Sequence, residues 1–168
     1  MEKVQVGGVK RPLAEVVGEI EQREWWRAIR MRDLMSSPVI CVDSLTTVTD
    51  AHVLMHDRKI RRLPVIDDGK LVGILTQGDV RGAMPSEVTT LNRAEQDYLI
   101  RQLKVERVMS REVIVATEEM TLADAARLLV QYKIGGLPVI TDGKVVGMVT
   151  ESDIFGIVVA MIDKLDQI

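Results

Sequence analysis

Two short stretches of the chain combine residue types that suit a phosphate and a ribose. The stretches "LVGILTQGDV" (71–80) and "VVGMVTESDI" (145–154) each run apolar residues into a glycine and then into Thr-x-x-Asp. This pattern predicts a strand followed directly by a helix. The free N–H groups of a helix start suit phosphate, and a carboxylate there can accept hydrogen bonds from a cis-diol. Gly73 and Gly147 leave room beside the strand for a close approach.

The same spacing also caps helices, and the chain contains its own comparison. Thr-x-x-Asp resembles a capping box, although Glu or Gln is the usual partner of the Thr. Thr47 with Asp50, and Thr121 with Asp124, repeat the spacing at two further predicted helix starts that no glycine-bearing strand precedes. We expect these two pairs to be caps only. Spacing alone therefore leaves ligand contact and simple capping both open at the glycine-bearing junctions.

These junctions occur twice because the chain contains an internal repeat. Residues 35–84 align with residues 109–158 without a gap, at an offset of 74 residues. Each copy is too small to bury a good core alone. We therefore expect two copies packed with pseudo-twofold symmetry.

Each copy has the pattern β-α-β-β-α. In the first copy, "VICV" (39–42) predicts a strand, 47–59 a helix, 63–76 a hairpin with Asp-Gly at its turn, and Gln77 the start of a second helix. The second copy repeats these elements 74 residues later, with "VIVA" as its first strand. The predicted fold class is α+β.

Two further helical segments flank the copies, at 11–35 and 91–109. The expected organisation is an N-terminal helical extension (1–32), the first repeat (33–84), a linker helix (85–106), and the second repeat with a C-terminal helix (107–168).

Composition excludes several classes of function. The net charge is −3, which argues against nonspecific binding to nucleic acid or to an acidic membrane. The single cysteine, Cys41, excludes a disulfide within the chain and is expected in the core. No apolar run approaches the roughly 20 residues of a membrane span, and the first ten residues lack a signal-peptide core. We expect a cytoplasmic protein.

The repeated motif resembles a known family. "RRLPVIDDGKLVGILTQGD" and "GGLPVITDGKVVGMVTESD" look like a tandem pair of CBS (cystathionine-β-synthase-type) domains, also called a Bateman module, over 33–84 and 107–158. Stand-alone bacterial CBS pairs, some of them acetoin-utilisation-like, are the most similar kind. The N-terminal helix departs from the family pattern.

The resemblance implies a ligand and a set of contacts. CBS pairs bind AMP, ADP, ATP, S-adenosylmethionine or dinucleotides in clefts between the copies, and commonly form homodimers. The resemblance assigns the ribose hydroxyls to Asp79 and Asp153, the phosphate region to Thr76 and Thr150, and the adenine to backbone near Ile40, Ile114, Pro64 and Pro138.

The two copies differ just before the Leu-Pro-Val strand. The first has Arg61 and Arg62, where the second has Gly135 and Gly136. In family members basic residues here reach phosphates, and the planar fork of arginine suits that role; a solvated arginine pair is the alternative. If the arginines bind phosphate, the first site favours a phosphorylated nucleotide. The second then takes an uncharged or cationic adenosyl compound, or stays empty.

The leading hypothesis is a regulatory adenosine-nucleotide sensor that acts through a dimer or an effector protein. The alternative is a ligand-free dimerisation scaffold. We expect neither catalysis nor a catalytic cofactor, because no nucleophile–base pair or phosphate loop is present.

Two pairs of residues need a separate explanation. His52 and His56 are four residues apart, but without a third ligand they predict no metal site. Trp25 and Trp26 are expected to pack onto the domain or onto a partner chain.

Overall fold

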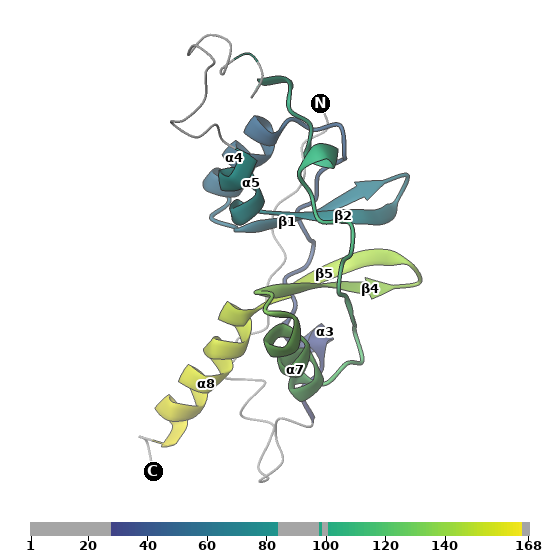
Figure 1. The fold of residues 1–168 in the computed structure, drawn as a ribbon. Helices are drawn as coiled ribbons and strands as arrows, with labels where there is room; N and C mark the ends of the chain where they lie inside the picture. Colours follow the sequence, from purple (N-terminus) through teal and green to yellow (C-terminus); the bar gives the residue numbers. More distant parts are fainter. Residues whose placement is uncertain (1–27, 84–97, 99–100, 166–168) are drawn as a thin grey trace. The chain divides into compact units, whose positions relative to one another are not determined.

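The computed structural model describes residues 28–83, 98 and 101–165 (Figure 1). Most of the predicted N-terminal extension and of the predicted linker helix, including Trp25 and Trp26, lies outside these residues. Among the described helices, none has the length and apolar content needed to cross a bilayer.

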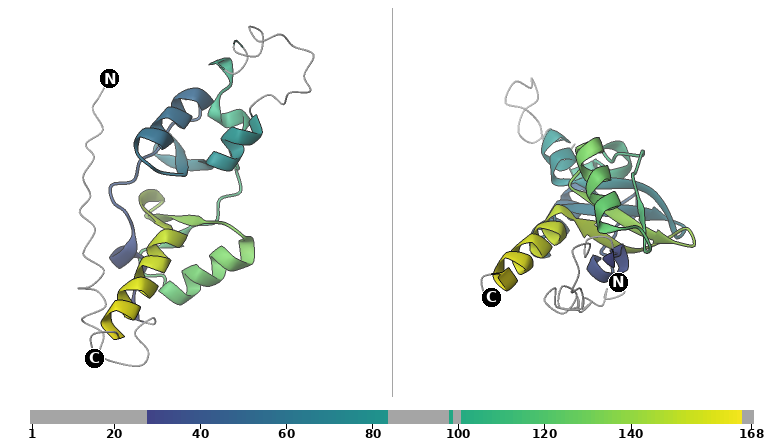
Figure 2. Two further views of the ribbon diagram at one scale, coloured as in Figure 1. Left: turned by 90° about the vertical axis from the view of Figure 1, so that its left-hand side faces the viewer. Right: turned by 90° about the horizontal axis from the view of Figure 1, so that it is seen from below.

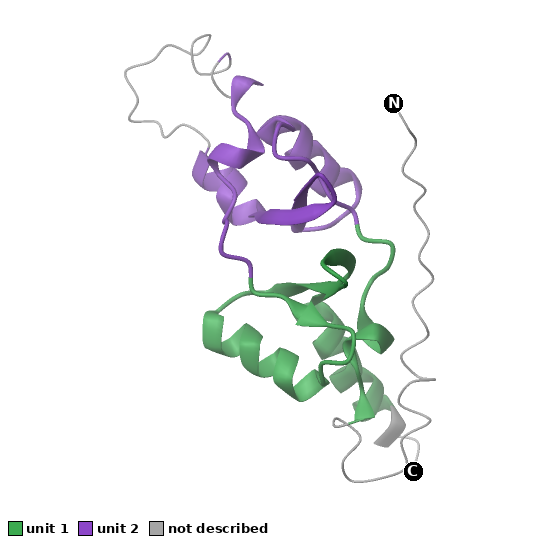
Figure 3. Ribbon diagram, turned by 90° about the vertical axis from the view of Figure 1, so that its right-hand side faces the viewer, with its two compact units in different colours: residues 1–39, 114–168 green, residues 40–113 purple. Residues whose placement is uncertain are grey.

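The chain separates into two compact units (Figure 3). Unit 1 draws its described residues from Met1–Val39 and Ile114–Ile168, and unit 2 from Ile40–Val113. Each unit therefore contains the hairpin of one repeat together with the chain segment that leads into the other repeat.

Unit 2 is built around the hairpin of the first repeat. Its elements are α4 (Val48–Asp57), the antiparallel strands β1 (Arg62–Asp67) and β2 (Lys70–Thr76), α5 (Gln77–Ala83) and the 3₁₀ turn η1 (Val105–Arg107). The predicted helix–hairpin–helix order of the first copy is confirmed.

Unit 1 repeats this plan around the second hairpin. Its elements are α3 (Met31–Leu34), β3 (Ala116–Thr117), α7 (Leu122–Tyr132), β4 (Gly136–Thr141), β5 (Lys144–Thr150) and α8 (Glu151–Leu165). Strand β3 runs parallel to β4, and β4 pairs with β5 antiparallel. The three helices lie on the same side of the β4–β5 hairpin (Figures 1 and 2). The α+β fold class is confirmed.

The two hairpin turns form as their sequences predict. Asp68 and Gly69 have φ of 49° and 75°, and Asp142 and Gly143 have φ of 49° and 77°. Two consecutive residues of positive φ suit the twist of the flanking strands, and Asp-Gly adopts them at low steric cost.

The first strand of each copy is shorter than predicted. Residues 39–42 make a single parallel bridge, Val42 to Val65, and the second copy makes the two-residue strand Ala116–Thr117. In the first copy the chain turns away at Ser44 and Leu45, immediately after passing the edge of the hairpin. Strand pairing is therefore limited to the few residues that pass beside the hairpin.

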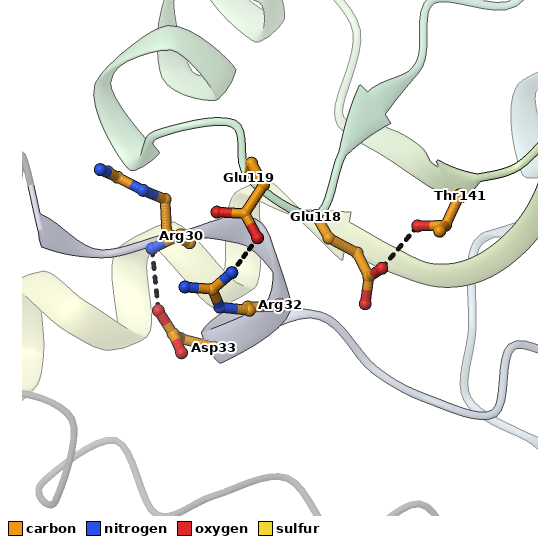
Figure 4. Close-up of polar contacts among 6 residues, drawn as sticks. All are labelled: Arg30, Arg32, Asp33, Glu118, Glu119 and Thr141. Atoms are coloured by element: carbon orange, nitrogen blue, oxygen red, sulfur yellow. Dashed lines mark hydrogen bonds and ion pairs between the residues drawn. The ribbon is translucent and has the colours of Figure 1, made fainter.

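The chain segment that leads into the first repeat is hydrogen-bonded to the second repeat. The Met31 N–H donates to Met120 O at 3.0 Å, Arg32 N–H to Glu118 O at 3.2 Å, and Leu122 N–H to Ile29 O at 3.0 Å. Figure 4 shows the adjoining polar contacts, in which Arg32 pairs with Glu119.

The segment leading into the second repeat is bound to the first by the equivalent bonds. Val105 N–H donates to Thr46 O at 2.9 Å, Glu106 N–H to Ser44 O at 3.0 Å, and Val48 N–H to Leu103 O at 2.8 Å. The repeat therefore extends upstream to these leading segments, and each segment completes the fold of the other copy.

These contacts explain why two predicted helices are interrupted. The helix predicted over 11–35 is broken at Arg30, which is extended (φ −109°, ψ 161°) and bridges Thr121. The helix predicted over 91–109 is likewise broken at Lys104, which is extended and bridges Thr47. An isolated β-bridge needs extended backbone, so the tertiary pairing overrides the local helix propensity.

Each unit has its own aliphatic core. That of unit 1 consists of Ile29, Met31, Leu34, Ala116, Leu122, Ala125, Leu129, Leu137, Val139, Val149 and Ile157. That of unit 2 consists of Val48, Ala51, Met55, Leu63, Val65, Leu75, Val80, Val105 and Met109. The leading segments thus supply core side chains as well as hydrogen bonds.

Cys41, predicted in the core, is only half-buried. Burial nonetheless raises the pKa of its thiol to about 11. Near pH 8 the thiolate fraction is then about a hundredfold below that of an ordinary thiol. We expect slow labelling by a thiol reagent in the native protein and fast labelling in denaturant. Equal rates in the two conditions would contradict this burial.

Candidate functional site

The first glycine-bearing junction forms a reciprocal cap. Asp79 Oδ2 accepts hydrogen bonds from the Thr76 N–H and from Thr76 Oγ1, both at 2.7 Å. In return, the Asp79 N–H donates to Thr76 Oγ1 at 3.3 Å. The strand end and the first turn of α5 therefore hold the carboxylate in one orientation.

The second junction repeats the arrangement at deeper burial. Asp153 Oδ2 accepts from the Thr150 N–H and from Thr150 Oγ1, both at 2.8 Å. Asp153 is 8% exposed, whereas Asp79 is half-buried. Both acidic residues predicted to contact ribose are thus fixed by the Thr three positions earlier.

The two comparison pairs are caps, as predicted. Asp50 N–H donates to Thr47 Oγ1 at 3.0 Å, and Asp124 N–H donates to Thr121 Oγ1 at 3.1 Å. The two hydroxyls donate back to the carboxylates at 2.7 Å. The hydrogen bond from Thr121, followed by the bond and charge of Arg127, holds the pKa of the Asp124 carboxyl below its ordinary value.

The two kinds of junction differ in one bond. At Asp79 and Asp153 the carboxylate also accepts from the backbone N–H of the Thr, which draws it back over the strand end. At the two comparison pairs, all of whose residues the structure describes, this bond is missing. Among the described residues, no hydrogen bond reaches the second oxygen of Asp79, Oδ1, so that oxygen can still accept one from a hydroxyl group.

The structure brings the arginine pair to the first junction. Arg62 pairs with Thr76 across the β1–β2 hairpin, and the Gln77 N–H donates to Arg61 O at 2.9 Å. The backbone of both arginines therefore adjoins the strand-to-helix step that carries Asp79. Sequence separation alone does not predict this proximity, because it results from the register of the β1–β2 hairpin.

Glycines occupy the equivalent place at the second junction. Gly136 pairs with Thr150, and the Glu151 N–H donates to Gly135 O at 3.1 Å. The backbone geometry of the two junctions is thus matched, while the cationic side chains are present at only one of them.

Of the residues predicted to flank adenine, Pro64 and Pro138 lie in strands, whereas Ile40 and Ile114 lie in the irregular segments that precede the first strand pairing of each copy. Pro64 is buried in β1, and its carbonyl accepts from the Val42 N–H at 3.1 Å. Ile40 packs against the core of unit 2 and Ile114 against that of unit 1. Pro138 is buried in β4. The predicted residues fall into two sets: Ile40, Arg61, Arg62, Pro64, Thr76 and Asp79 in unit 2, and Ile114, Pro138, Thr150 and Asp153 in unit 1.

The room beside the two glycines, predicted to admit a close approach, is filled by protein. A Cβ on Gly73 would meet the Sδ of Met109 and would lie 3.0 Å from Ser110 O. A Cβ on Gly147 would lie 2.8 Å from Met35 Cγ. The glycines therefore admit the leading segments, and sequence reasoning missed both methionines as their partners.

The two histidines lie on the surface of α4. Both His52 and His56 are exposed, and His56 Nδ1 lies 3.3 Å from Asp57 Oδ1. In the part of the chain that the structure describes, no group of three or more His, Cys, Asp or Glu side chains could hold a metal ion.

Comparison with known proteins identifies the fold. The family model for the CBS domain matches residues 31–86 and again 105–160. The chain belongs to the CBS domain family. A CBS domain-containing protein of Dictyostelium discoideum is 31% identical over 137 residues, which cover 80% of this chain and 94% of that protein.

Solved CBS pairs share the architecture. The CBS domain pair of protein MJ0100, crystallised with 5′-methylthioadenosine and S-adenosyl-L-methionine, has a TM-score of 0.67 and 30% identity, over 79% of this chain and 98% of that one. A Vibrio cholerae structure that carries the name of the acetoin utilization protein AcuB has a TM-score of 0.68 and 27% identity, over 83% of this chain and 97% of that one.

Proposed function

We propose that this CBS pair is a regulatory module that binds an adenosine compound at the Thr-Asp junctions. The observation that carries the proposal is the geometry of Asp79. Thr76 orients its carboxylate through Oδ2, and Oδ1 accepts no hydrogen bond from any described residue. A preoriented carboxylate of this kind suits ribose hydroxyls. The adenosine compounds bound by the MJ0100 CBS pair support the choice of ligand class.

The first junction suits a phosphorylated nucleotide. Arg61 and Arg62 flank the strand end next to Thr76, and guanidinium groups bind phosphate in pairs of hydrogen bonds. Asp79 would hold the ribose, and the backbone near Ile40 and Pro64 would contact adenine. AMP, ADP and ATP are the candidates for this junction.

The second junction suits a ligand without phosphate. Asp153 Oδ2 accepts from the N–H and the hydroxyl of Thr150 as Asp79 Oδ2 does from Thr76, but Gly135 and Gly136 bring no cationic side chain. The backbone near Ile114 and Pro138 would contact adenine here. S-adenosylmethionine, an uncharged adenosine compound or an unfilled junction is consistent with this chemistry.

The output of the module would pass through assembly. A ligand shifts an equilibrium only as far as it binds one arrangement better than another. We propose that a homodimer in the cytoplasm, or an effector protein, reads that shift, and that the module itself catalyses nothing. One observation favours the alternative, a ligand-free scaffold: Thr76 and Asp79 already form a reciprocal helix cap without a ligand.

Calorimetric titration with AMP, ATP and S-adenosylmethionine tests the proposal. The decisive variant is Asp79→Ala, with Asp50→Ala as its matched control in the same unit. Each substitution removes a carboxylate from a Thr-x-x-Asp cap, so each is expected to cost about 1 kcal/mol of stability. Of these two variants, only Asp79→Ala should abolish AMP or ATP binding, because the carboxylate of Asp79, unlike that of Asp50, is drawn over the strand end.

Two results would support the scaffold instead. The first is the absence of binding across all three compounds in the wild-type protein. The second is equal binding by the wild type, Asp79→Ala and Asp50→Ala. The same titrations on Asp153→Ala, with Asp124→Ala as its matched control, show whether the second junction binds a ligand or stays empty.

A further inference from the structure

Helix α8 exposes a continuous apolar stripe. Its members follow the spacing i, i+3, i+4, i+7 and are Phe155 (66% exposed), Val158 (46%), Val159 (56%) and Ile162 (52%), called here the α8 stripe. The adjacent face of α8 already packs into the core through Ile154 and Ile157. The helix is therefore apolar over more of its surface than the core of unit 1 covers, which marks an interaction surface.

The fold itself does not require an apolar side chain at the position of Phe155. The repeat aligns Phe155 with Arg81 in α5, at the same place in the equivalent helix of unit 2. That position tolerates a charged, exposed residue in one copy. An exposed aromatic side chain at the position of Phe155 is therefore a feature of the second copy that the shared fold does not dictate.

The N-terminal part of the chain joins the same unit. Ile29 is buried in the core cluster that also contains Ile157 of α8, and its carbonyl accepts from the Leu122 N–H. The chain preceding residue 28 therefore leads directly into the unit that carries the stripe.

The sequence of that preceding chain is complementary to the α8 stripe. Residues 11–27 place apolar side chains at the same spacing of i, i+3, i+4, i+7, at Leu13, Val16, Val17 and Ile20. A helix of that length would extend about 25 Å, comparable with the 15 residues of α8.

We propose that residues 11–27 cover the α8 stripe within the same chain. Covering removes the exposed apolar side chains of both segments from water, which favours association. The tether holds the two partners at a high effective concentration, so a modest interface is sufficient. This inference does not depend on the binding of an adenosine compound.

The two tryptophans of the chain make the proposal testable in the full-length protein. Trp25 and Trp26 are the only tryptophans in the sequence, and both belong to residues 11–27. In the wild type we expect blue-shifted emission and slow quenching by acrylamide, both independent of protein concentration.

The stripe variant Phe155→Ser with Val159→Ser should expose the tryptophans. We expect a red shift and loss of protection from acrylamide, with an unchanged far-ultraviolet circular dichroism spectrum. The matched control is Val130→Ser, because Val130 is 79% exposed on α7, outside the stripe. It should leave the emission of the wild type unchanged.

A second variant approaches the contact from the other side. The double variant Val17→Ser with Ile20→Ser changes the apolar residues of the 11–27 segment and should cause the same red shift. The proposal is overturned if wild-type tryptophans are already exposed, or if either double variant keeps the wild-type protection. Protection that rises with protein concentration, together with a larger mass by light scattering, would assign the stripe to a second copy.

Discussion

Replacing Met31 with Ala is expected to lower the free energy of unfolding by about 2–5 kcal/mol. The side chain of Met31 is fully buried in the core of unit 1. Removing this side chain should therefore destabilise the β4–β5 hairpin of the second repeat, although Met31 precedes the first repeat in the chain. Chemical denaturation measures the change in the free energy of unfolding, and amide hydrogen exchange shows which strands and helices lose protection.

The internal repeat supplies a control for this result at the equivalent residue of the other leading segment. Val105, which is 74 residues after Met31, is equally buried, but in the core of unit 2. Val105→Ala should reduce the amide protection of the β1–β2 hairpin instead. If Met31→Ala weakened β1–β2 more than β4–β5, the assignment of the leading segments to opposite repeats would be wrong.

Gly73→Ala is the second substitution with a large expected effect. The new methyl group would meet Met109 Sδ and would lie 3.0 Å from Ser110 O. The methionine can rotate, but Ser110 is held by two hydrogen bonds to Ile74, of 2.9 and 3.0 Å. Overpacking of this kind costs about 1–3 kcal/mol, measured as a lower melting temperature.

Gly82→Ala is the control within the same unit. Gly82 lies in α5, and a Cβ there would meet no atom within 4 Å. Alanine in a helix is favoured over glycine by about 0.5–1 kcal/mol, so this variant should be slightly more stable than the wild type. A neutral Gly73→Ala would show that the leading segment can move away from the strand.

Much of the secondary structure follows from local sequence. The Asp-Gly turns, for example, specify hairpins because the two central residues adopt positive φ, as Asp68 and Gly69 do. The caps at Thr47 and Thr121 likewise depend on residues three positions apart. Such features need no distant partner, so spacing and residue type are sufficient to predict them.

The candidate site was only partly predictable. Residue types and family resemblance pointed to Thr76 and Asp79, but spacing did not separate their junction from a plain cap. The distinguishing bond, from the Thr76 N–H to the carboxylate, depends on how the strand meets the helix. The position of Arg62 beside Thr76 depends on hairpin register.

Which copy each leading segment completes was decided by tertiary structure alone. Met35 and Met109 are equivalent residues, and Gly73 and Gly147 are equivalent strand positions, so local sequence allows either methionine to pack on either glycine. The structure places Met35 on Gly147 and Met109 on Gly73. In an internal repeat, each of these contacts has two chemically similar possible partners. Which partner is used depends on the path of the chain in the folded structure, and local sequence does not specify that path.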